Sequence, residues 1–238
     1  MVSIENTTTE IAASGAEIVV LPVGAVEQHG PHLPVGTDAI VAGERARRLA
    51  EKLGAYLLPV LAYGNSQEHL GFKGTVSLRP STLAIVIEDI ILSLRHQGFT
   101  KFVVLSTHGG NWIIKPTIRD LNFRHPDITI IWADGALPGE TDRIPRDIHS
   151  GAGETSTMLA VNESLVKGRG PDFTPAVGQE YNDYVGMHLS TETGVWGEPS
   201  KASKDLGQEG LATTAERQAE YVRATFARVK QLRDRERE

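Results

Sequence analysis

The chain has 238 residues, a length that suits one large domain. Hydrophobic residues make up 40% of it and charged residues 23%, and the formal net charge of −6 argues against nucleic acid as the main partner. The absence of cysteine excludes disulfides and thiolate chemistry, so any metal must be held by nitrogen and oxygen ligands. The first residues lack a secretory-signal pattern and no apolar run is long enough for a membrane span, so we expect a cytoplasmic protein.

Buried apolar runs alternate with helical periodicity along the chain. The pattern predicts strands at 17–23, 56–61, 101–107 and 128–133, and helices at 37–53, 81–97 and 112–125, with loops over 168–196 and a long helix at 210–238. Such alternation is typical of right-handed βαβ units. We therefore expect one α/β domain over residues 1–238, with a mainly parallel sheet covered by helices on both faces.

Polar side chains follow the first and third of these strands. Glu27 and His29 lie two residues apart after the first strand, Asp38 starts the next helix, and His108 follows the strand at 101–107. Ligands of open α/β sheets bind outside the carboxyl ends of the strands, so these groups should share one crevice. Burying them together without a cation would be costly, which favours a metal site. The alternative is that the histidines are hydrogen-bonded surface residues and Asp38 only begins a helix.

Two further glycine-rich segments carry polar groups. The pair Gly109-Gly110 could cradle a phosphate through backbone N–H groups, or it could let a substrate approach the backbone closely; no nucleotide-binding motif surrounds it. Farther along, His149 is followed by a small-residue loop and by Glu154, which opens a helical stretch. A carboxylate in the first turn of a helix is also a common capping feature, so both roles stay open for Glu154.

Four segments together resemble the creatininase (creatinine amidohydrolase) family. They are LPVGAVEQHGPHLPVGTD at 21–38, EHLGFKGTVSL at 68–78, STHGGN at 106–111 and HSGAGETS at 149–156. The resemblance, which runs from about residue 17 to 160, implies a three-layer α/β/α sandwich, a homo-oligomer that is often a hexamer, and two divalent metal ions (zinc, manganese or iron). It implies that Glu27 and His108 hold one ion and His29 the other, that Asp38 bridges them, that Glu154 supplies a further carboxylate, and that His149 gives a proton to the leaving group.

The sequence departs from this family pattern at several places, and two of them bear on the pocket. Creatinine-hydrolysing members carry a metal-binding Glu two residues after the histidine of the third segment, where this chain has Gly110. Other branches have Gly there and use the later carboxylate, which is Glu154 here. Lys73 also replaces a common Pro. The first difference argues against creatinine itself as the substrate.

The sequence thus predicts a metal-dependent hydrolase of a small-molecule substrate, with Ser66 and Gly109 as substrate-binding residues. We expect an amidohydrolase that uses a two-metal-activated water on a small cyclic amide, a formamide or a related C–N bond. One alternative is hydrolysis of a C–C bond in a cyclic polyol ketone of the inosose type. Another is a phosphate- or nucleotide-binding module built on the Gly109-Gly110 loop. Glu68 and His69 either line the pocket or only make hydrogen bonds within their loop.

Overall fold

The computed structural model describes residues 1–133 and 147–236. Within these residues, one sheet has five parallel strands in the order β1-β3-β2-β4-β5. The strands are β1 (Val2–Ser3), β2 (Ile18–Val23), β3 (Tyr56–Leu57), β4 (Lys101–Ser106) and β5 (Thr129–Trp132). The two longest strands, β2 and β4, pair over their full length and form the centre of the sheet.

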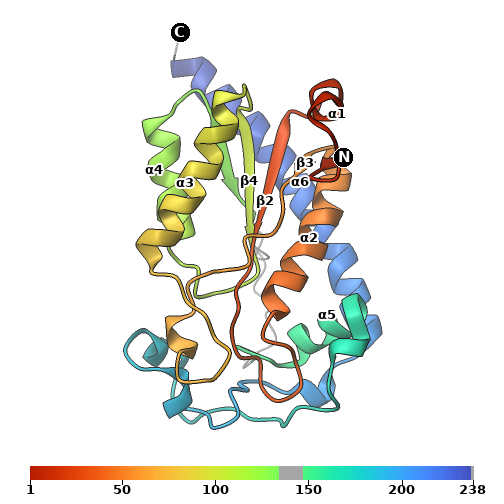
Figure 1. The fold of residues 1–238 in the computed structure, drawn as a ribbon, viewed down its shortest axis with the longest axis vertical. Helices are drawn as coiled ribbons and strands as arrows, with labels where there is room; N and C mark the ends of the chain where they lie inside the picture. The colour runs from red at the N-terminus through yellow and green to blue at the C-terminus, as the bar shows by residue number, and fades with distance from the viewer. Residues whose placement is uncertain (134–146, 237–238) are drawn as a thin grey trace.

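Helices cover both faces of the sheet, which confirms the expected three-layer sandwich (Figure 1). The bounds of the helices are α1 (Thr8–Ala13), α2 (Thr37–Leu53), α3 (Pro80–His96), α4 (Ile114–Arg124), α5 (Ala152–Asn162) and α6 (Lys204–Glu236). Helices α3 and α4 lie on one face, whereas α2 and α6 lie on the other. Among the described residues, none of these helices is both long and apolar enough to cross a membrane.

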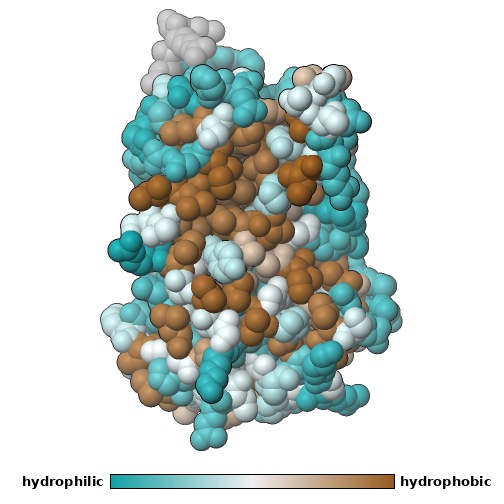
Figure 2. Space-filling view, in the orientation of Figure 1, coloured by the Kyte–Doolittle hydropathy of each residue, from teal (hydrophilic) through white to brown (hydrophobic). Residues whose placement is uncertain are grey.

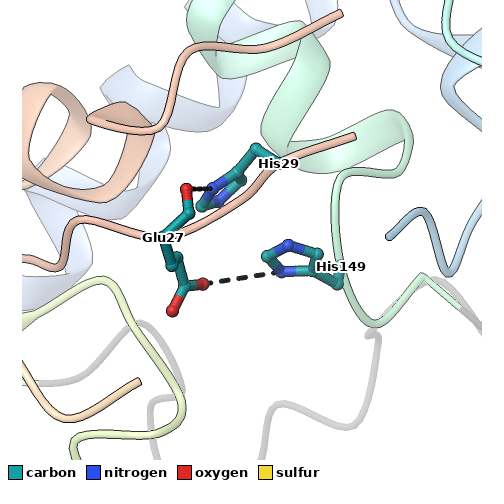
Figure 3. A group of neighbouring side chains, drawn as sticks. All are labelled: Glu27, His29 and His149. Carbon is teal, nitrogen blue, oxygen red and sulfur yellow. Dashed lines mark hydrogen bonds and ion pairs between the residues drawn. The ribbon is translucent and has the colours of Figure 1, made fainter. Parts of the chain in front are cut away.

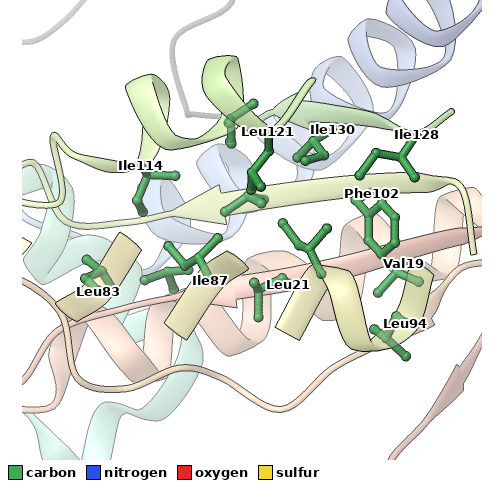
Figure 4. Packing of buried hydrophobic residues seen from close by; sticks show 14 residues of the cluster. Val19, Leu21, Leu83, Ile87, Leu94, Phe102, Ile114, Leu121, Ile128 and Ile130 are labelled. Atoms are coloured by element: carbon green, nitrogen blue, oxygen red, sulfur yellow. The ribbon is translucent and has the colours of Figure 1, made fainter. Parts of the chain in front are cut away.

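Successive side chains of a strand point to opposite faces of the sheet, and this divides the hydrophobic core into two layers. In β2, Leu21 points into the cluster with α3 and α4, whereas Val20 points into the cluster with α2 and α6. Figure 4 shows the first layer, in which Ile87 of α3 and Leu121 of α4 pack over β2 and β4. Because both faces of a parallel sheet are buried, its strands are apolar on both sides. This explains why β2 and β4 are continuous apolar runs in the sequence.

The predicted elements differ from the observed ones mainly at their ends. The helix expected at 37–53 is observed with these bounds, and α3 begins one residue before its prediction. The strand expected at 56–61 ends at Leu57, because Pro59 has no N–H to donate to a ladder; Leu61 then makes an isolated parallel bridge to Val23. Helix α6 begins at Lys204, six residues before its prediction, and the short β1 and α1 were not predicted.

The order of the strands creates a switch point between β2 and β4. The chain runs from β2 outward to β3 on one side, then crosses back to β4 and on to β5 on the other. Loops that leave β2 and β4 therefore diverge to opposite sides of the sheet and leave a crevice at the strands' carboxyl ends. The loop after β2 carries Glu27 and His29, and the loop after β4 carries His108.

Candidate metal centre

Glu27 and His29 project from the extended segment that follows β2, and His149 reaches them from the segment before α5 (Figure 3). Oε1 of Glu27 lies 3.7 Å from Nδ1 of His149, and the rings of His29 and His149 have centroids 4.4 Å apart. Nδ1 of His29 lies 3.2 Å from the backbone oxygen of Glu27 and donates to it. This hydrogen bond places the proton of a neutral His29 on Nδ1 and leaves Nε2 free to bind a cation.

Asp38 and Glu154 face that free nitrogen. Nε2 of His29 lies 3.8 Å from Oδ1 of Asp38 and 3.7 Å from Oε2 of Glu154. One ligand atom from each of the three residues lies within 4.8 Å of the others. Asp38 is in the first turn of α2 and Glu154 in the first turn of α5, so both helices direct their N-terminal ends at this point.

The other oxygen of Asp38 faces a second group. Oδ2 of Asp38 lies 3.7 Å from Nδ1 of His108, and Nε2 of His108 lies 3.1 Å from Oε2 of Glu27. The carboxylate of Asp38 therefore stands between His29 on one side and His108 on the other. This is the placement that a carboxylate shared by two cations requires.

Burial and the charges of neighbouring groups together raise the pKa values of His29, His108 and Asp38 and lower that of Glu27. Burial opposes protonation of His29 and His108, but the neighbouring carboxylates outweigh it and raise both pKa values to about 10. Burial would raise the pKa of Glu27, but the surrounding histidines hold it well below its usual value. Burial, with the charge of Glu27, raises the pKa of Asp38. Opposite charges are thus packed together in a site that water barely reaches.

Several polar atoms of the cluster have no hydrogen-bond partner among the described residues. They include Nε2 of His29 and Oδ2 of Asp38, and both residues are at most 2% exposed. Oε2 of Glu27, in a residue 1% exposed, pairs with Nε2 of His108 at 3.1 Å. Buried polar atoms without a partner are rare because they lose the hydration that they had in the unfolded chain. Nitrogen and carboxylate oxygen are suitable donors for zinc, manganese or iron, so these residues fit two divalent cations.

Gln28 forms hydrogen bonds with two histidines of the cluster. Its Nε2 donates to Nδ1 of His69 at 2.9 Å and to the backbone oxygen of Gly194 at 3.1 Å, and its backbone oxygen accepts from Nε2 of His149 at 2.7 Å. Gly194 has a φ of +79°, and a Cβ there would lie 1.7 Å from Oε1 of Gln28, so this contact requires glycine. Gln28 thereby fixes two rings at once.

His69, for which the sequence leaves two roles open, lies inside the cluster. It is buried, its ring centroid lies 4.5 Å from that of His149, and its Nε2 lies 3.6 Å from Oε1 of Glu27. Burial lowers the pKa of His69 to about 3, so its ring is neutral. Since Nδ1 accepts from Gln28, the proton is on Nε2 and points toward Glu27. The feature of the sequence that could have indicated this place for His69 is its position next to Glu68, in a loop between two predicted strands.

Ser66 and Gly109, the two expected substrate-binding residues, occupy different places. Gly109 lines the cavity that opens over the cluster. Ser66 is fully buried, and its hydroxyl lies 3.3 Å from Nε2 of His108. Its neighbours Asn65 and Gln67 form the cavity wall instead. A substrate contact of Ser66 stays a prediction, whereas its contact with the histidine is observed.

A cavity of about 1140 Å³ opens over the cluster. Glu27, His108, His149 and Glu154 lie at its wall, together with residues of the segment 179–187. Further acidic residues on the wall are Glu68, Glu180 and Asp183, and among the described residues that line it there is no Lys or Arg. Without bound cations the cavity is therefore strongly acidic, and two divalent cations would offset the charge of the carboxylates that bind them.

Comparisons with known proteins agree with the resemblance. The creatininase family model, described as creatinine amidohydrolase, matches residues 5–222. Creatinine amidohydrolase of Pseudomonas putida is 31% identical over 238 residues, covering 90% of this chain and 92% of that protein. Mycofactocin precursor peptide peptidase of Mycolicibacterium smegmatis is 29% identical over 220 residues, covering 87% and 85%. The crystal structure of a creatinine amidohydrolase (creatininase) superposes with a TM-score of 0.80 at 27% identity, covering 94% and 98%. Structures of a manganese form of creatininase and of a zinc–zinc form of a mutant creatininase also match.

Proposed function

The chain belongs to the creatininase family and is a metal-dependent hydrolase with divalent metal ions as cofactors, and we propose that Asp38 is the residue shared by its two ions. The placement of the Asp38 carboxylate between His29 and His108 supports this proposal. On this assignment Glu27 and His108 hold one ion, and His29 and Glu154 hold the other. When bound, the two ions lower the pKa of a water molecule and polarise the bond to be cleaved.

His149 is suited to move the proton of the reaction. Its Nε2 is occupied as a donor to the backbone oxygen of Gln28, so Nδ1 is the atom that can take or give a proton. Burial, together with the charge of His29, lowers the pKa of His149, which keeps Nδ1 unprotonated and able to accept a proton first. A histidine in this state can pass that proton on to a leaving nitrogen. The leaving group would be placed on the cavity side of His149.

The walls of the cavity limit the substrate. The two cations would offset the carboxylates that bind them, but Glu180 and Asp183 also line the cavity and no Lys or Arg does within the described residues, so a phosphate away from the ions would meet repulsion. This argues against a phosphate-binding module that works without metal. We propose a neutral or cationic substrate with a C–N bond to cleave, such as a small cyclic amide or a formamide. Backbone N–H groups at Gly109 and Gly110 would assist a developing oxyanion.

A substrate panel with metal analysis tests the function. Metal-stripped protein reloaded with zinc or manganese is incubated with a cyclic amide, an N-formyl amine, a short peptide, a phosphorylated formamide and a cyclic polyol ketone. We expect metal-dependent release of an amine from an uncharged or cationic amide, and loss of this activity with a chelator. Full activity in chelator-treated protein that holds no metal would refute the proposal. Cleavage of the polyol ketone alone would instead support C–C bond hydrolysis.

We also propose that the chain forms a homo-oligomer, with a hexamer as the state that the family resemblance implies. Figure 2 shows apolar side chains gathered on the face that carries α3. Ile85 of α3 is 59% exposed, and Tyr63, which precedes η1 (Gln67–His69), is 52% exposed. Large exposed apolar areas commonly mark subunit contacts. Light scattering should show a single oligomer that Ile85→Glu weakens; a monomer at micromolar concentration would exclude it.

A further inference from the structure

A third carboxylate lies at the Glu27–His108 end of the cluster. Oε1 of Glu68, in η1, is 3.6 Å from Nε2 of His108, and this nitrogen is 3.1 Å from Oε2 of Glu27. One ligand atom from each of the three lies within 4.8 Å of the others. Two ligand atoms bound at about 2.1 Å to a tetrahedral ion are about 3.4 Å apart. One cation could therefore contact all three side chains with little movement.

The backbone at Gly110 makes room for this carboxylate. A Cβ at position 110 would lie 2.3 Å from Oε1 of Glu68, 2.3 Å from Nε2 of His108 and 2.5 Å from the backbone oxygen of Asn65. All three distances are far below van der Waals contact, so a side chain at 110 and the carboxylate of Glu68 exclude one another. The space beside the imidazole of His108 is thus filled from η1 and not from the β4 loop.

An independent feature indicates that a cation belongs at this end. Glu27 is 1% exposed, and the pairing that its Oε2 makes among the described residues is with Nε2 of His108, at 3.1 Å, in the same space. Glu68 brings a second carboxylate close to it, and the ion-pair distances of Glu68 within the described residues are to His69 and His108. Two carboxylates sharing a largely buried site repel one another unless a positive charge lies between them, which a protonated His108 supplies without metal and a cation supplies once it takes the place of that proton.

We propose that Glu68 is a ligand of the metal ion at the Glu27–His108 end. This inference rests on the proposed function and completes it, because Glu68 then serves this ion and Glu154 serves the ion at His29. It requires that His108 binds through Nε2 and gives up the 2.8 Å hydrogen bond from this nitrogen to the backbone oxygen of Asn65. Because Asp38 faces Nδ1 of His108 at 3.7 Å, it also requires that the Asp38 carboxylate or the His108 ring turns for Asp38 to reach the same ion. If His108 bound through Nδ1, beside Asp38, Glu68 would have no direct contact with the ion.

Metal binding to Glu68→Gln tests the inference without reference to activity. This change keeps the size of the side chain and removes its charge. Metal-free protein is titrated with zinc against a chromophoric chelator, and bound zinc is measured after gel filtration. We expect two ions per chain in the wild type, and in Glu68→Gln one unchanged site and one weakened by more than about 100-fold. Loss of an outer contact weakens binding only about 10- to 100-fold, so the magnitude separates a ligand from a positioning residue.

Glu180→Gln is the matched control, because Glu180 lines the same cavity but lies outside the clusters that could hold a cation. It should bind two zinc ions as the wild type does. Cobalt in place of zinc provides a second measurement: the visible spectrum of one site should change in Glu68→Gln and stay unchanged in Glu180→Gln. Two sites in Glu68→Gln, each weakened less than about 100-fold, would overturn the role of Glu68 and leave the function intact. A folded wild type that binds no divalent metal would overturn the function itself.

Discussion

His149 donates its Nε2–H to the backbone oxygen of Gln28 at 2.7 Å, and its other nitrogen, Nδ1, lies 3.7 Å from Oε1 of Glu27. The hydrogen bond of Nε2 thereby determines that Nδ1 is the ring atom that faces Glu27. The same ring also belongs, with Glu27 and His29, to a group of three residues that could hold a cation. Substitution of His149 distinguishes a proton carrier from a metal ligand, because the first role affects kcat and the second affects metal content.

Replacement of His149 by Ala should slow the reaction and leave the metal in place. If Nδ1 moves a proton, kcat should fall by about 10²- to 10⁴-fold with a smaller change in KM. Steady-state kinetics and metal analysis of the same preparation provide the measurement. A variant that loses one ion per chain would show that His149 is a ligand.

Substitution of Asp38 should affect both ions, since its two oxygens face the two histidines. Asp38→Asn removes the charge that both ends share, so we expect both metal affinities to fall. Glu154→Gln should weaken only the ion held by His29, because Glu154 contacts this end alone among the groups that could hold a cation. Zinc titrations of the two variants compare these effects. Equal losses at both sites in Glu154→Gln would contradict the assignment.

Metal binding should release protons and become tighter as the pH rises. In the metal-free protein, His29 and His108 have pKa values of about 10, raised from 6.5, so both are protonated at pH 7. A cation must displace these protons, and apparent affinity should increase roughly 10-fold per pH unit for each proton displaced. Calorimetry in buffers of different ionisation enthalpy should detect the release of about two protons when both sites fill. Affinity that is constant between pH 6 and 9 would contradict these pKa values.

The same shifts predict how the metal-free fold responds to pH. A histidine with a raised pKa contributes stability that is fully present below pH 6.5 and is lost as the pH rises through about 10. The melting temperature of the metal-free protein should therefore fall between pH 7 and 10, and the stabilisation by added zinc should grow over this range. Thermal melts at several pH values, with and without zinc, test the prediction; parallel curves would refute it.

Gln28→Leu should weaken catalysis without removing metal. The leucine cannot donate to His69 or to the backbone oxygen of Gly194, so buried acceptors lose their partner at a cost of about 1–3 kcal/mol. We expect a lower free energy of unfolding and a reduced kcat, because His69 and the backbone that holds His149 are less well fixed. Gln208→Leu, on the exposed side of α6, is the matched control. Unchanged unfolding and kinetics in Gln28→Leu would show that Gln28 does not position these rings.

The sequence by itself determined the layers of the fold. In a parallel sheet covered on both faces, a strand such as β2 is buried on both sides and is a continuous apolar run in the sequence, and helices such as α2 and α3 bury one face. Both patterns arise from neighbouring residues, so they can be recognised in the sequence. The family resemblance was likewise readable, because its segments are long and ordered along the chain, and the family model confirms it. The cytoplasmic location and the substrate contact of Ser66 stay predictions.

Only the tertiary structure decided how the polar groups divide between the two ends of the cluster. The sequence placed Glu27, His29 and His108 at strand ends, but which oxygen of Asp38 faces which histidine depends on how α2 meets β4. The burial of His69 and the space that Gly110 leaves for Glu68 arise where η1 folds over the β4 loop. Contacts between residues more than 40 positions apart have no local periodicity, so no local pattern in the chain could reveal them. The metal ligands that the motifs predict thus gain Glu68 as a further candidate ligand, a role that the motifs alone left undecided.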